Sequence, residues 1–325
     1  MPRRVQSVRP AQNESPENVN VFLYAVTVFA WGLSWYAVQM QLGVVSPEVS
    51  VFYRFAISAA VMALFCLVTR RRMDFTARDH LSIAAQGLFL FGMNFYLVYR
   101  GSQFLPSGLV SILFSMLVVM NMIGGALFLK NPVDQKVIVS AAFGIAGIVS
   151  VFWRDLAGFD LDRARMRDTM TGIALVLSGT LSASNGMMIS AANQRRGPGV
   201  VRTNTLGMAY GAPFFLVFCV ARGAEFTVDW SARYLGSLMF LSLVSTVIAF
   251  ATYLTLAGRI GPERAAYASV VFPLVALAVS TWAEGFQWTG GAIAGVMLVL
   301  AGNLFVLTKS PPAARPENPA AKGDA

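Results

Sequence analysis

Long apolar segments separated by short polar ones make up most of this chain. Ten of them are long enough to cross a bilayer as a helix, which takes about 20 apolar residues. They lack the alternating pattern of about ten residues that is typical of a transmembrane β-barrel. Because backbone polar groups inside lipid need partners within the chain, the pattern predicts ten transmembrane helices. The predicted spans are residues 20–40, 47–69, 80–99, 105–129, 134–153, 169–191, 201–221, 234–257, 262–284 and 287–308.

Composition supports the same fold class. Hydrophobic residues are 56% of the 325, and the mean hydropathy is +0.61, both high for a soluble domain. We therefore predict an all-α integral membrane protein, multi-pass and in contact with membrane lipid. Residues 1–19 and 309–325 are polar, and we expect them to be disordered cytoplasmic tails.

Basic residues in the loops predict the orientation in the membrane. If the N-terminus is cytoplasmic, seventeen of the 25 Lys and Arg residues face the cytoplasm and seven face outside, while Arg54 lies within a span. The segment 154–168, an external loop in this arrangement, carries four of the seven together with four Asp residues. We expect both termini to be cytoplasmic. The net charge of +9 then reflects topology and attraction to anionic lipid, and we expect no nucleic-acid partner.

An internal repeat is the next feature of the chain. A shift of 155 residues lays residues 106–152 over 261–307 without a gap, and it matches Ala146-Gly147 with the identical Ala301-Gly302. The shift places the fourth and fifth helices over the ninth and tenth. Duplicated units with five helices each insert in opposite orientations, as in secondary transporters. The sequence thus predicts two inverted five-helix repeats, residues 20–153 and 169–308, joined by the loop 154–168.

Several motifs resemble a known family. They are Trp31-Gly32-Leu33-Ser34-Trp35, Phe52-Tyr53-Arg54-Phe55, and the run from Tyr253 through Arg259-Ile260-Gly261-Pro262-Glu263-Arg264-Ala265-Ala266 to Pro273 and Glu284. Together they resemble the drug/metabolite transporter superfamily in its ten-helix EamA-type branch, and most of all its YddG-type exporters of aromatic and other amino acids. The resemblance covers residues 20–308 and implies a secondary carrier.

The chain departs from the family pattern in two places. Val118 stands where the second repeat has Pro273, and Leu129-Lys130-Asn131 replaces the Gly-Glu ending that is common after the fourth helix. We therefore expect the first repeat to flex differently from the second. Four prolines are candidate hinge or gating positions, because proline frees a carbonyl within a helix. They are Pro106, Pro213, Pro262 and Pro273.

The spans contain polar groups but almost no charge. All sixteen acidic residues lie in tails, loops or helix ends, which argues against a carboxylate proton relay. Neutral polar and aromatic residues are instead expected to line a central cavity that binds the substrate. Each small hydroxyl also suits helix packing. The candidate substrate-binding residues are Trp31, Trp35, Asn94, Tyr99, Ser111, Asn185, Ser245, Tyr253 and Tyr267.

Arg54 is the one full charge inside a span. It lies in the second helix, where two roles remain open: a structural or gating tie to neighbouring polar groups, or a contact with a substrate carboxylate. Glycines Gly291 and Gly295 permit a close helix contact, either within the chain or between two chains, so we expect a monomer or a weak homodimer.

These features predict a carrier that exports amino acids, including aromatic ones, and related small metabolites by alternating access. A phosphorylated substrate would need more basic residues in the cavity. The alternative is a multidrug or lipophilic-cation exporter of the same fold, with proton coupling. An enzyme is disfavoured, since the spans lack paired acids and bases; we expect no catalytic residues, metal site or cofactor. The composition suits a bacterial inner membrane.

Overall fold

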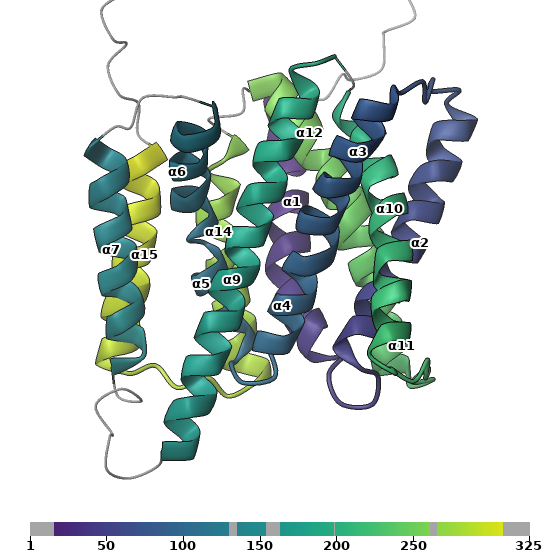
Figure 1. Cartoon of the computed structure of the whole chain (residues 1–325). Helices are drawn as coiled ribbons and strands as arrows, with labels where there is room; N and C mark the ends of the chain where they lie inside the picture. The colour runs from purple at the N-terminus through teal and green to yellow at the C-terminus, as the bar shows by residue number, and fades with distance from the viewer. Residues whose placement is uncertain (1–15, 130–134, 154–162, 198, 261–264, 308–325) are drawn as a thin grey trace, which may run out of the picture.

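The computed structural model describes residues 16–129, 135–153, 163–197, 199–260 and 265–307, and every regular element in these ranges is a helix (Figure 1). The elements are α1 (Pro16–Gln39), α2 (Pro47–Val68), α3 (Ala77–Gln86), η1 (Gly87–Met93), α4 (Asn94–Gly101), α5 (Ser107–Phe114), α6 (Leu117–Leu129), α7 (Gln135–Val151), α9 (Arg163–Gln194), α10 (Val200–Ala221), α11 (Ala232–Met239), η2 (Phe240–Ile248), α12 (Ala249–Ile260), α14 (Ala268–Ala283) and α15 (Gly290–Leu307).

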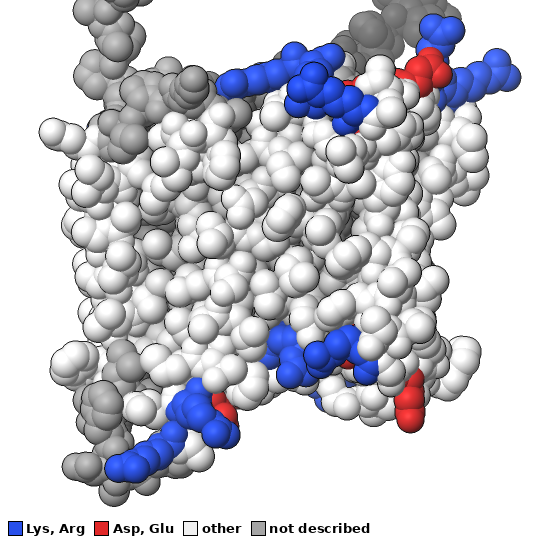
Figure 2. Space-filling view, viewed as in Figure 1, with Lys and Arg blue, Asp and Glu red and all other residues white. Residues whose placement is uncertain are grey.

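The helices form ten membrane spans, as predicted. Eight are long and apolar enough to cross a bilayer, and two shorter apolar helices, α7 and α14, complete the set. The spans stand side by side (Figure 1), and the charged side chains gather at their two ends, with a white, uncharged band between them (Figure 2). The exposed apolar side chains of this band suit contact with lipid. The fold is that of an all-α integral membrane protein.

The two inverted five-helix repeats have matching interruptions. The third span of the first repeat consists of α3, the π-helical turn η1 and α4, and the third span of the second consists of α11, the π-helical turn η2 and α12. A π-helix is rare and tends to mark a functional position. Here the rare turn occurs in the corresponding span of both repeats.

The last helices of the two repeats, α7 and α15, pack directly on each other. A Cβ atom added at Gly295 would lie 2.4 Å from the carbonyl oxygen of Gly147, and one added at Gly147 would lie 2.7 Å from the carbonyl oxygen of Gly295. Only glycine permits so close an approach of the two backbones. The sequence left open whether Gly295 packs against a helix of the same chain or of a second chain. In the structure it packs within the chain.

Two features of the helices differ most from the prediction. The helix α9 begins at Arg163, inside the segment predicted to be a loop, because a polar helix end can extend beyond the apolar span. The fourth span is interrupted between Phe114 and Leu117, where the amide of Met116 donates to the carbonyl of Leu113 in a tighter turn. The sequence shows no proline at this break.

The predicted proline hinges lie in different settings. Pro213 is inside α10 and Pro273 is inside α14, where each removes a helical hydrogen bond. Pro106 is the N-cap residue of α5. Pro262 lies outside the described residues.

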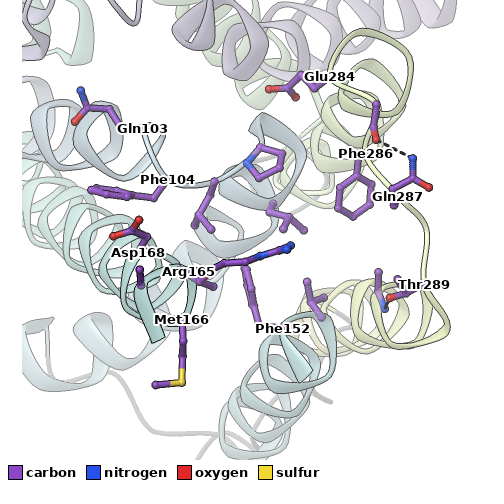
Figure 3. Close-up of a pocket in the computed structure, with 18 residues that line it drawn as sticks. Gln103, Phe104, Phe152, Arg165, Met166, Asp168, Glu284, Phe286, Gln287 and Thr289 are labelled. Atoms are coloured by element: carbon purple, nitrogen blue, oxygen red, sulfur yellow. Dashed lines mark hydrogen bonds between the residues drawn. The ribbon is translucent and has the colours of Figure 1, made fainter. Parts of the chain in front are cut away.

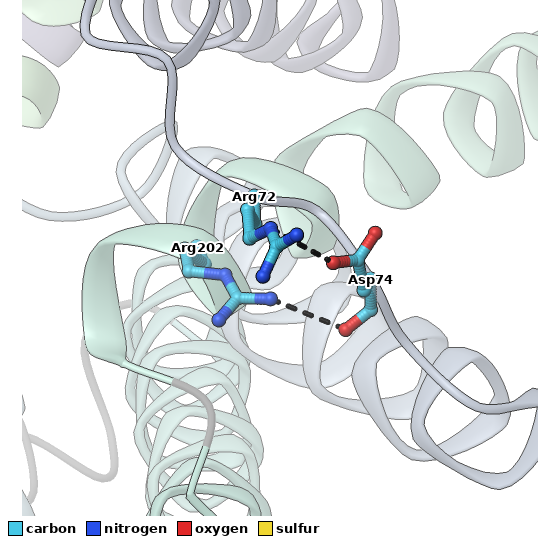
Figure 4. A network of polar contacts seen from close by, with 3 residues as sticks. All are labelled: Arg72, Asp74 and Arg202. Atoms are coloured by element: carbon cyan, nitrogen blue, oxygen red, sulfur yellow. Dashed lines mark hydrogen bonds and ion pairs between the residues drawn. The ribbon is translucent and has the colours of Figure 1, made fainter.

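A small polar network joins the loop between α2 and α3 to the start of α10 (Figure 4). Arg72 Nε lies 3.8 Å from a carboxylate oxygen of Asp74, and Arg202 Nη2 donates to the backbone carbonyl of Asp74 at 3.2 Å. The guanidinium of Arg202 also lies over the ring of Phe75. The Arg72 and Asp74 side chains are 89% and 83% exposed, so their ion pair contributes little to stability.

Candidate functional site

A cavity of about 590 Å³ lies between the helices in the centre of the molecule. Both repeats contribute to its walls. Toward one face it extends to Val137 near the start of α7 and to Leu307 at the end of α15. Toward the other face its lining ends at Trp35, Arg54 and Phe114. These residues lie a few positions before the end of α1 and well after the starts of α2 and α5, which are the helix ends at that face. The cavity therefore reaches toward the face where α1 begins, and stops short of the opposite face.

Aromatic rings form much of the wall. The rings of Trp31 and Tyr253 are 5.1 Å apart, and the indole N–H of Trp31 donates to the carbonyl oxygen of Ser245 at 3.2 Å. Trp35 packs against Phe114 at 5.0 Å and stacks on Phe272 at 6.2 Å. The two indoles lie four residues apart and line the same cavity, because residues i and i+4 share one face of a helix.

Two asparagines in the wall each have an acceptor without a protein partner. The amide nitrogen of Asn94 donates to the carbonyl of Leu90 at 3.1 Å, and that of Asn121 contacts the sulfur of Met187 at 3.2 Å. Among the described residues neither side-chain oxygen has a hydrogen-bond partner, nor has the indole nitrogen of Trp35. Unmet polar groups are costly in the interior of a protein, so a polar ligand that satisfied them would gain binding energy.

Arg54 lies at the inner end of the cavity and is 3% exposed. Its Nε and Nη2 atoms donate to the hydroxyl oxygen of Thr246 at 3.3 and 3.1 Å. The guanidinium also lies over the ring of Phe95, 4.4 Å from its centroid. Thr246 belongs to η2 and its own hydroxyl donates to the carbonyl of Leu241, five residues earlier. The π-helical turn thus presents an acceptor to Arg54, which links the two repeats.

The predicted substrate-binding residues divide into two groups. Five of them line the cavity. They are Trp31, Trp35, Asn94, Ser245 and Tyr253. The other four are not in its lining. Tyr99 is fully buried, and its hydroxyl donates to the side-chain oxygen of Gln41 at 2.8 Å. The hydroxyl of Ser111 donates to the carbonyl of Gly108, and that of Tyr267 donates to the carbonyl of Leu307 at 3.3 Å. Asn185 is half-buried in α9.

Asn121 also lines the cavity and is not among the predicted substrate-binding residues. The signal was present, because Asn121 is the only strongly polar residue in the apolar run of α6. An amide in such a run is a candidate for a bundle interior.

A second hollow, of about 1030 Å³, lies at the opposite face (Figure 3). The close-up shows Arg165 and Asp168 at the start of α9, with Phe286 and Gln287 on the segment that leads to α15. We call this hollow the vestibule. One apolar cluster lies between the vestibule and the cavity. It includes Leu105 and Phe152 from the wall of the vestibule and Trp35 and Phe272 from the wall of the cavity.

Polar ties reinforce the closure at this face. The side-chain amide of Gln39 donates to the carbonyls of Ser102 and Leu105 at 2.9 and 2.7 Å. The carboxylate of Glu284 accepts from the backbone N–H of Ser107 at 3.2 and 3.1 Å and from its hydroxyl. The structure therefore shows a conformer that is closed on the vestibule side of the cavity.

Comparisons with known proteins agree with this architecture. The model of the EamA-like transporter family matches residues 19–153 and again residues 170–308. A probable amino-acid metabolite efflux pump of Salmonella typhimurium is 24% identical, over 86% of this chain and 92% of that protein. Its namesake in Escherichia coli is 24% identical over 88% and 94%, and an uncharacterized transporter of Bacillus subtilis is 22% identical over 90% and 99%. A crystal structure with 15% identity superposes with a TM-score of 0.60 over 90% of this chain and 96% of the other, which supports the fold.

Proposed function

The chain belongs to the EamA-like transporter family, and we propose that it exports amino acids, including aromatic ones, and related small metabolites by alternating access across the inner membrane. The observation that carries this proposal is the central cavity, which both repeats line and which reaches toward one face and stops short of the other. A carrier needs a site between its repeats that is reached from one side at a time.

The chemistry of the cavity favours a zwitterion with an apolar side chain. Indole and phenyl rings suit an apolar or aromatic group. The unpartnered oxygens of Asn94 and Asn121 suit an ammonium group. Among the residues that line the cavity, Arg54 is the only cation, which is too little for a phosphorylated solute. The names of the two amino-acid metabolite efflux relatives support the same choice.

A lipophilic cation fits the cavity less well. No Asp or Glu is among the residues that line it in the described part of the chain, and Arg54 would repel a cation. The described lining also offers no carboxylate to carry a proton. We therefore expect flux that does not depend on a pH gradient.

The test is transport by the purified protein in liposomes. Uptake of labelled phenylalanine, tryptophan and threonine is measured with and without an imposed pH gradient, beside a labelled lipophilic cation. Saturable amino-acid flux that ignores the gradient is the expected result. Cation flux driven by the gradient, with amino acids ignored, would overturn the proposal in favour of a drug exporter.

A further inference from the structure

Arg54 is a buried charge that has no acidic partner within 4.0 Å in the described part of the chain. It lies seven residues after Pro47 in α2, and so about 10 Å along the helix from its end. Its side chain is 3% exposed, and among the described residues the one ion pair within 4.0 Å joins Arg72 and Asp74 instead. A buried cation without a countercharge costs several kcal/mol.

The neutral partners of Arg54 compensate only part of this cost. Thr246 offers one hydroxyl oxygen, shared by Nε and Nη2, and the hydroxyl of Tyr99 also interacts with the guanidinium. The rings of Phe55 and Phe95 offer their faces at 5.5 and 4.4 Å. A guanidinium has five N–H donors, arranged to match two oxygens of one carboxylate. The site is therefore fixed in position by neutral groups and remains cationic.

From this geometry, and resting on the proposed function, we infer that Arg54 recognises the carboxylate of the transported amino acid at the inner end of the cavity. Because Arg54 lines the cavity, a ligand in that space lies beside this residue, on the cavity side of the apolar cluster around Trp35. The structural tie to Thr246 then serves to position the guanidinium. A carboxylate would supply the missing countercharge, and the same solute without it would bind weakly.

The test separates recognition from stability. Thermal shifts of the purified protein are measured with 3-phenylpropionate and with 3-phenylpropanamide, which lacks the charge. We expect the wild-type protein to be stabilised by the carboxylate and not by the amide, and the Arg54→Gln variant to lose this discrimination. In liposomes, Arg54→Gln should raise the KM for phenylalanine about tenfold or more, as expected for a lost charged hydrogen bond. Thr246→Val, which keeps the charge, should retain the preference for the carboxylate.

The outcomes are distinct. The inference is wrong if the wild-type protein does not discriminate between the two probes. It is also wrong if Arg54→Gln lowers the unliganded melting temperature and leaves the discrimination intact, since Arg54 is then a structural tie. If carboxylate recognition depends on Arg54 but no amino acid is transported, the proposed function fails and the inference about Arg54 stands.

A second inference comes from the tie between Glu284 and Ser107. Ser107 is the first residue of α5 in the first repeat, and Glu284 ends α14 in the second. The carboxylate accepts the N–H of Ser107 and its hydroxyl, at the positive end of the α5 dipole. The contact therefore fastens the two repeats together at the closed face of the cavity.

The sequence does not repeat this pair of groups at the equivalent positions. The shift of 155 residues places Leu129 over Glu284 and Pro262 over Ser107. Leucine has no acceptor in its side chain, and proline has neither a hydroxyl nor a backbone N–H. Both partners are thus absent from the equivalent positions.

We infer that this asymmetry biases the carrier at rest toward the conformer that is closed at the Glu284 face. The tie stabilises that closure, and the residues at the equivalent positions of the other repeat, Leu129 and Pro262, cannot make the same pair of hydrogen bonds. Ligand binding then has to offset the difference for the cavity to open toward the vestibule.

Accessibility of the cavity tests the bias without a substrate. Ser115 lines the cavity. Ser115→Cys is introduced into a variant that lacks Cys66 and Cys219, and an impermeant maleimide is added at the Glu284 face. The rate at which the new cysteine is labelled measures how often the cavity opens to that face. We expect Glu284→Ala to speed this labelling about two- to fivefold, a factor typical of a charge at a helix terminus. Ser107→Ala keeps the backbone N–H and should change it less. An unchanged rate in a folded Glu284→Ala protein would overturn the inference, and amino-acid flux measured separately reports on the proposed function.

Discussion

The indole of Trp31 in the first repeat lies against the phenol ring of Tyr253 in the second, with ring centroids 5.1 Å apart. This pair forms part of the wall that both repeats share, and a rocking motion of the repeats must change it. Truncation of Tyr253 to alanine removes the ring and opens a gap beside Trp31. We expect Tyr253→Ala to raise the KM for phenylalanine about five- to tenfold, since an aromatic contact contributes about 1 kcal/mol beyond its buried area. Tyr253→Phe, which keeps the ring, should stay close to wild type in the same liposome assay.

Asn94 provides an independent test of the cavity. Its side-chain oxygen has no partner among the described residues. If the ammonium group of the substrate binds to this oxygen, removal of the amide removes that hydrogen bond. Asn94→Ala should raise the KM for amino acids about tenfold, with a smaller effect on 3-phenylpropionate binding. If both Asn94→Ala and Tyr253→Ala transport with normal rate and affinity, the substrate does not bind in this cavity.

The contact between α7 and α15 allows a matched test of packing. Gly295→Ala places a methyl group 2.4 Å from the carbonyl oxygen of Gly147, so the helices must separate. We expect a loss of about 1–3 kcal/mol in stability, read as a lower melting temperature in detergent. Gly290→Ala in the same helix meets nothing within 4 Å and serves as the control. Equal melting temperatures for the two variants would show that the close contact is not needed.

Topology is open to direct measurement. Counting basic residues in the loops predicts that both termini are cytoplasmic. A fluorescent protein that folds only in the cytoplasm, fused after residue 325, should be bright, and an alkaline phosphatase fused at the same place should be inactive. The opposite pair of results would invert the orientation, and the central cavity would then face outside in the conformer described.

Sequence patterns could predict the fold because the bilayer imposes a length and a polarity on each span. The ten spans and the two repeats follow from apolar runs and from the shift of 155 residues. The face that each span turns to the interior was harder to predict. Lipid is as apolar as the bundle interior, so an apolar residue gives little indication of direction.

Polar residues in the spans could be predicted as interior, but not as exposed to the cavity. Asn94 and Tyr99 both lie in α4 and both are buried, yet Asn94 lines the cavity and Tyr99 donates to Gln41. The distinction depends on which neighbour each side chain meets across the bundle, and that neighbour is distant in sequence. Asn121 shows the same limit. Its position in an apolar helix indicates that it faces the bundle interior, but only the packing of α6 against α9 places it at the cavity.

The matching π-helical turns η1 and η2 also bear on the history of the chain. A hydrogen bond from residue i+5 to residue i encloses one residue more than an α-helical turn does. Independent acquisition of such a rare turn in the corresponding span of both repeats would require the same change twice. Inheritance requires it once, in a single five-helix ancestor that paired with an inverted copy of itself before the gene was duplicated. The Thr246 acceptor that η2 now presents to Arg54 would then be a later specialisation of a turn that both halves already possessed.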